Sequence, residues 1–62
     1  MIIKLTHIRG KDIFVNVRNI LYFNEFEKGT TITLAENIQV DVSESVDRVM
    51  QIIDYEVSQN VK

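Results

Sequence analysis

The chain has 62 residues, with nine acidic and seven basic side chains, a formal net charge of −2, one histidine and no cysteine. A chain of this length forms one small domain with a limited core, and its composition excludes a disulfide, a thiolate metal site and a histidine cluster. Small domains without such supports commonly gain stability by self-association, so we expect a homo-oligomer.

The N-terminal part of the sequence predicts a β-hairpin. Residues 2–8 and 12–17 both alternate polar with β-branched side chains, which is the pattern of a strand with one buried face. Gly10 lies between the two segments, where a glycine supplies the positive φ that a tight turn often needs. Phe14 is expected on the face of the second strand that its valines do not occupy.

Three more strands are predicted at residues 20–27, 30–35 and 38–42. The first is almost continuously apolar and aromatic, whereas the other two alternate, with Thr33 expected to point outward. Asn37 lies in the expected turn before the last strand. Because sequential antiparallel strands usually pair with their neighbours, the expected strand order is 1-2-3-4-5.

A helix is predicted over residues 44–60, because the hydrophobic period changes from two to about 3.6 after Ser43, the expected N-cap. The stripe expected to pack on the sheet consists of Val46, Val49, Met50, Ile53, Val57 and Val61. The predicted fold class is therefore α+β, in a single domain of residues 1–62. It is a five-stranded antiparallel meander, open to curling into a partial barrel, with one C-terminal helix packed on one face.

Apolar residues occupy both faces of the predicted strands, but one helix covers only one face. Exposed apolar surface of this kind usually marks a contact with another protein. The candidate interface residues are those with no expected cover within the chain: Phe14, Leu21, Phe23, Ile52 and Tyr55. We therefore expect a protein partner or a second copy of the chain at this surface. Pairing of open strand edges is another route to self-association.

The charges are unevenly distributed along the chain. Residues 1–18 carry four basic side chains against Asp12 alone, whereas residues 36–62 carry six acidic side chains against two basic ones. The candidate basic patch consists of Lys4, Arg9, Lys11 and Arg18. Such asymmetry is common on an ordinary solvated surface, and a nucleic-acid-binding domain would be more basic. We therefore do not expect a nucleic-acid partner, although the basic hairpin would suit an acidic one.

The side chains needed for catalysis are sparse. His7 has no cysteine to act with, and Ser43 and Ser45 lie at the predicted start of a helix, where serines serve as caps. Glu25 and Glu27 share a strand face and could hold a divalent ion, but glutamates near a hairpin end usually keep a strand edge soluble. So short a chain also leaves little room for a ligand pocket. We expect no enzyme activity, cofactor or metal.

No apolar segment is long enough to span a bilayer, so membrane insertion is not expected. The apolar residues 1–5 are too few for a signal peptide. Together with the absence of cysteine, these features favour a cytoplasmic location.

Several segments of the sequence together resemble the FlbD family, called SwrD in some bacteria. They are the IKLT, GK and VN segments at residues 3–6, 10–11 and 15–16, ITL at 32–34 and VSESV at 42–46, followed by Val49, Ile53 and Tyr55. Departures include Arg9 in place of the family's asparagine and Val17 in place of its proline. The resemblance implies a small cytoplasmic accessory protein of flagellar motility, without defined catalytic residues.

The leading hypothesis is a non-enzymatic protein-interaction module that self-associates. One alternative is a small phage-type inhibitor that sequesters a host or defence factor. Another is a β-rich nucleic-acid-binding regulator that uses the basic hairpin. Residues 20–53 loosely resemble the LytTR type of DNA-binding domain, although such a domain would be longer and more basic.

Overall fold

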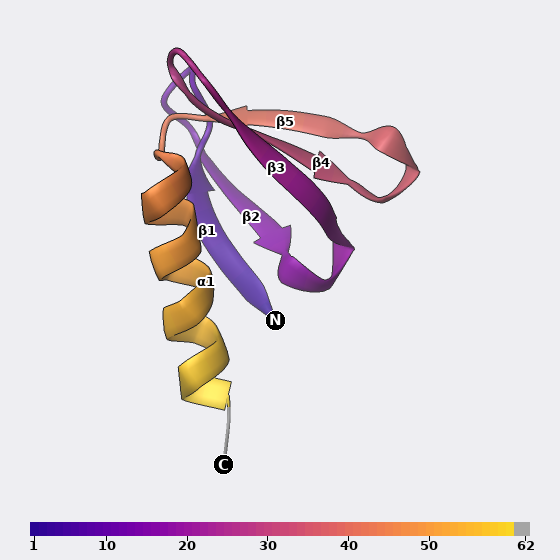
Figure 1. The fold of residues 1–62 in the computed structure, drawn as a ribbon, viewed down its shortest axis with the longest axis vertical. Coiled ribbons are helices and arrows are strands. Elements are labelled where there is room, and N and C mark those ends of the chain that lie inside the picture. Colours follow the sequence, from indigo (N-terminus) through magenta and orange to yellow (C-terminus); the bar gives the residue numbers. More distant parts are fainter. Residues whose placement is uncertain (61–62) are drawn as a thin grey trace.

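The computed structural model describes the backbone of residues 1–60 and the side chains of residues 1–59, and it confirms the α+β class. Five antiparallel strands precede one helix in this part of the chain (Figure 1). The elements are β1 (Ile2–Thr6), β2 (Asp12–Asn16), β3 (Ile20–Phe26), β4 (Gly29–Leu34), β5 (Gln39–Val42) and α1 (Val46–Asn60). Two short 3-10 helices precede β3 and β5: η1 (Val17–Asn19) and η2 (Ala35–Asn37).

The strands form two sheets and not one continuous meander. β1 pairs with β2, while β3, β4 and β5 form a second sheet in that order. The expected pairing of β2 with β3 is wrong because η1 turns the chain between them. The Arg18 N–H donates to Asn16 Oδ1 at 3.0 Å, which caps η1 and ends β2. The two sheets therefore do not close into a barrel.

β1 instead meets β5 where both strands end. His7 forms an isolated antiparallel bridge with Val42, and the Ser43 N–H donates to the Thr6 carbonyl oxygen at 2.8 Å. The Thr6 N–H in turn donates to both carboxylate oxygens of Glu44, at 2.9 and 3.0 Å. These contacts join the β1–β2 hairpin to the end of the second sheet.

The core lies where the two sheets and the helix meet. Its buried apolar residues are Ile3, Leu5, Val15, Ile32, Val42 and Val49. Strand register explains this set, since Ile3 lies opposite Val15 and alternate residues of a strand share a face. α1 packs against β1 and β3, and it runs beside β1 while β4 and β5 extend away from it (Figure 1).

Thr33 is buried, with 2% of its surface exposed, although the alternating pattern predicted an outward position. β4 is the central strand of its sheet, and Thr33 lies between Tyr22 on β3 and Gln39 on β5. Its small side chain is therefore covered by larger neighbours on the same face. The expectation of an outward Thr33 is therefore wrong.

The helix begins two residues later than predicted. Ser45 is the N-cap and not Ser43: the Arg48 N–H donates to Ser45 Oγ at 3.1 Å, and the Val49 N–H donates to the Ser45 carbonyl oxygen at 2.9 Å. The prediction failed because the backbone of Ser43 is bonded to β1 and so continues the line of β5. The residue between the two serines, Glu44, is also held by β1, through its side-chain carboxylate.

The buried face of α1 is rotated relative to the predicted stripe. Val49 is fully buried and Ile53 packs against the core, as expected, but so does Ile52. Met50 and Val57, which were expected to face the sheet, are 49% and 41% exposed. The helix packs between β1 and β3, which moves its contact line toward Ile52. Val61 lies outside the described residues.

Candidate interaction surfaces

The outward side of the β1–β2 hairpin carries apolar and basic side chains next to each other. Phe14 is 69% exposed and lies directly opposite Lys4 in the strand register. Ile2, two residues from Lys4 on the same face, is also exposed. The inward residues of the same strands, such as Val15, are buried in the core. The hairpin therefore has one face for the core and one for solvent.

The candidate basic patch is spread along the hairpin. All four of its residues are exposed. Lys4 lies on β1, Arg9 and Lys11 lie in the turn, and Arg18 lies in η1 at the opposite end of β2. The structure therefore places these charges along the hairpin and at both of its ends, with Asp12 as the acidic residue among them.

The candidate interface residues do not form a single cluster. Phe14, Leu21 and Tyr55 are well exposed, but they lie on β2, β3 and α1, respectively. Phe23 and Ile52 are half-buried and pack against the core, so they are less available than expected. The explanation is that α1 contacts β3, which covers part of both residues.

Several other large apolar residues are exposed that the sequence did not single out. They include Ile2, Tyr22, Ile38, Met50 and Val57. Apolar residues on both faces of β3 were the available signal for Tyr22, whereas Met50 and Val57 fit the predicted core stripe and gave no signal of exposure. Ile38 was expected inside the last strand, but that strand begins one residue later.

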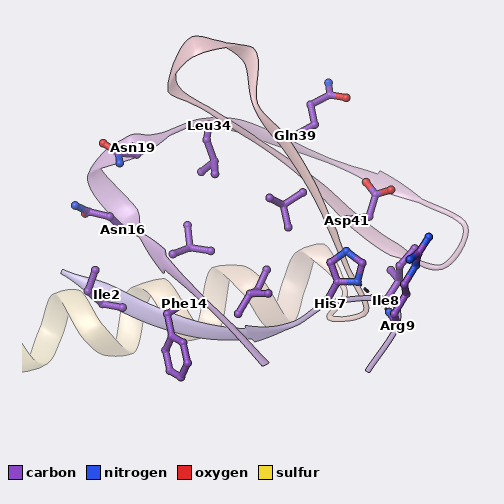
Figure 2. A pocket seen from close by; sticks show the side chains of 13 residues that line it. Ile2, His7, Ile8, Arg9, Phe14, Asn16, Asn19, Leu34, Gln39 and Asp41 are labelled. Carbon is purple, nitrogen blue, oxygen red and sulfur yellow. Dashed lines mark hydrogen bonds between the residues drawn. The ribbon is translucent and has the colours of Figure 1, made fainter. Parts of the chain in front are cut away.

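An open cleft of about 730 Å³ lies between the β1–β2 hairpin and the β4–β5 pair. Ile13, Val15, Leu34 and Val40 form its apolar walls, and Figure 2 shows Leu34 pointing into it while Phe14 points away. Its rim is polar and comprises His7, Arg9, Asn16, Asn19, Gln39 and Asp41. This volume falls within the range of small-molecule sites, so the expectation of little room for a pocket is wrong. The cleft exists because the two sheets remain open.

The polar residues considered for chemistry have structural contacts. His7 Nδ1 accepts a hydrogen bond from the Arg9 N–H at 3.1 Å, and Ser45 caps α1. Glu25 and Glu27 are both exposed. Among the residues that the structure describes, no group of three or more histidine, aspartate or glutamate side chains is arranged to hold a metal ion.

The fold and its exposed surfaces define a small α+β protein. Its biological setting comes from its similarity to a known protein family. A family model described as "Flagellar and Swarming motility proteins" matches residues 1–59. The chain therefore belongs to the FlbD family, and the resemblance seen in the sequence is confirmed. No curated protein and no solved structure gives a significant match. Within the described residues, no helix has the length and apolar character needed to cross a membrane.

Proposed function

We propose that this FlbD-family protein is a non-enzymatic interaction module that self-associates in the cytoplasm as part of its role in flagellar or swarming motility. The family membership gives the setting. The molecular activity is inferred from the surface of the protein.

The main support is the large amount of apolar surface that the fold leaves exposed. Among residues 1–59, six apolar residues are buried in the core, whereas ten large apolar residues are exposed. Single exposed apolar side chains are normal, but residues gathered on one face favour a protein contact. Phe14 and Ile2 are gathered in this way on the hairpin, and Met50 and Val57 lie two turns apart on α1.

Open strand edges give independent support. β2 and β3 each stand at the end of a sheet, so one side of each strand has no partner strand in the described structure. Such edges are liable to pair with another chain unless they are protected. A protein this small gains both core and edge protection from association.

The proposal that the protein is not an enzyme rests on the positions of its polar groups. Ser45 caps α1, Glu44 accepts from the Thr6 N–H of β1, and His7 accepts a backbone hydrogen bond within its own turn. A catalytic site needs such groups directed at one reacting atom. Here they serve three separate backbone contacts.

Size-exclusion chromatography with light scattering tests self-association. We expect a mass above the 7.2 kDa of one chain, increasing with protein concentration. A mass of 7.2 kDa throughout the micromolar to millimolar range would refute the proposal. In cells that depend on this protein for swarming, a folded Phe14→Ser variant should support less swarming than the wild type, and Ile38→Ser, also at an exposed position, is the matched control.

A second candidate is nucleic-acid binding by the basic hairpin, because Lys4, Arg9, Lys11 and Arg18 are all exposed there. Affinity that falls steeply as salt rises would support this function, since phosphate contacts release counterions. The absence of binding to single-stranded and double-stranded DNA and RNA at low salt would exclude it. The family membership gives no support to a phage-type inhibitor.

A further inference from the structure

The outward side of the hairpin, called here the hairpin face, combines an apolar centre with basic surroundings. Phe14 and Ile2 supply the apolar area, and Lys4 lies opposite Phe14 on the neighbouring strand. Arg9 and Lys11 lie in the turn at one end of the hairpin and Arg18 lies in η1 at the other end, with Asp12 as the single acidic residue among them. The hairpin face is therefore apolar and positively charged.

One side of α1, called here the helix flank, has the opposite charge. Asp47, Met50, Asp54 and Val57 follow one another at spacings of three or four residues, which places them along one side of a helix. All four are exposed. Asp47 and Glu25 of β3 line the same surface hollow, which extends the acidic area onto the sheet. The helix flank is therefore apolar and negatively charged.

The two surfaces cannot satisfy each other within one chain. Asp47, at the N-terminal end of the flank, shares a hollow with β3, while the hairpin face lies on the side of β1 and β2 away from the core. In the described part of the chain, no hydrogen bond or ion pair engages the side chains of Lys4, Asp47 or Asp54. The charges of both surfaces therefore remain available to another molecule.

We propose that the hairpin face of one copy binds the helix flank of a second copy. This inference rests on the self-association proposed above and identifies its interface. Phe14 and Ile2 would lie against Met50 and Val57, with Lys4 among the flank's aspartates. Contacts between two hairpin faces or between two helix flanks would bring like charges together, which costs several kcal/mol. Only the hairpin-to-helix contact brings complementary charges together.

This contact uses different surfaces on the two copies, so it is heterologous. A heterologous contact repeats from copy to copy and generates a ring or an open filament. Each copy then contributes its hairpin face to one neighbour and its helix flank to the other. The β4–β5 turn remains outside the contact, whereas Ile2 and Phe14 also line the cleft, so the contact reaches its edge.

Charge reversal with mixing is the decisive experiment. Lys4→Glu and Asp54→Lys should each weaken association at least tenfold, because each places like charges across the contact. A 1:1 mixture of the two variants should associate again, because both pairs of faces in the mixture are complementary. The double variant Lys4→Glu/Asp54→Lys should also recover. Lys28→Glu and Glu36→Lys, in exposed turns outside both surfaces, are matched controls and should leave the mass unchanged.

The readouts separate this inference from the proposed function. Light scattering measures the mass of each sample, and circular dichroism verifies that each variant is folded. A monomeric wild type would overturn both self-association and this interface. A wild-type oligomer that is insensitive to Lys4→Glu and Asp54→Lys, or a mixture that stays dissociated, would overturn this interface and leave self-association standing.

Discussion

The hydrogen bond between Thr6 and Glu44 gives the sharpest prediction about stability. Glu44 lies just before α1, and its two carboxylate oxygens share the Thr6 N–H at 2.9 and 3.0 Å. Its carbonyl oxygen also accepts from the hydroxyl of Thr30, which is fully buried, at 2.8 Å. Replacing Glu44 by alanine keeps the backbone contact and removes only the carboxylate. The Thr6 N–H is then left without its charged acceptor.

The expected cost follows from the strength of one charged hydrogen bond. Such bonds contribute about 1.5–3 kcal/mol, and the two oxygens count once because they share one N–H. Thr6 and Glu44 are both half-buried, so water offsets part of the loss and the lower figure of about 1.5 kcal/mol applies. For a domain of this size, that corresponds to a fall of roughly 6–12 °C in melting temperature.

Thermal and urea unfolding followed by circular dichroism measure this effect. All samples need the same protein concentration, because association also raises apparent stability. Glu44→Gln keeps one acceptor oxygen and should lose about half as much as Glu44→Ala. Glu27→Ala removes an exposed turn carboxylate and serves as the control. If Glu44→Ala unfolds at the wild-type temperature, the carboxylate does not hold the hairpin and the reasoning fails.

Three further predictions concern backbone geometry and are measured by the same unfolding experiments. Gly29→Ala should lower the free energy of unfolding by about 3 kcal/mol, because the added Cβ would overlap the Val42 carbonyl oxygen. Gly10 is also at positive φ but faces open space, so Gly10→Ala should lower it by only about 1 kcal/mol. Equal losses for the two variants would contradict the clash at Gly29. Glu36→Asn should raise the free energy of unfolding by about 0.5 kcal/mol, because Glu36 has a φ of 65° and asparagine tolerates this backbone region better than glutamate. A loss of stability would refute this prediction. Ser45→Ala should cost about 1 kcal/mol through loss of the N-cap, and an unchanged midpoint would contradict that role.

Most of the strands could be predicted from the sequence because they alternate apolar and polar residues, whereas the strand at residues 20–27 was predicted from an almost continuous apolar and aromatic run. Their pairing could not be predicted in full. Nothing in the apolar pattern marks the 3-10 turn at residues 17–19, which Asn16 caps and which separates β2 from β3. The cleft depends on this separation of β2 from β3, so it could not be predicted from the sequence either.

The candidate interface was predictable only where a residue has no neighbour from a distant element. Phe14 and Tyr55 are exposed as expected. Phe23 and Ile52 are partly covered because α1 packs against both β1 and β3, a contact between elements distant in the chain. Met50 was misplaced for the same reason, since helical spacing alone permits either side of the stripe to face the core. Tertiary packing decided between them.

The VSESV segment at residues 42–46 resembles the family pattern, and the fold accounts for most of it. Val42 belongs to the core, Ser43 and Glu44 bind the backbone of Thr6, and Ser45 caps α1. These residues are needed to join the hairpin, the second sheet and the helix, whatever the protein binds. Their resemblance to the family therefore indicates a shared fold and not a shared site. The surfaces that determine the partner are to be sought elsewhere, on side chains that the fold leaves free. The hairpin face and the helix flank meet this condition, because under the proposed interface a substitution there changes association without removing a contact that holds the domain together.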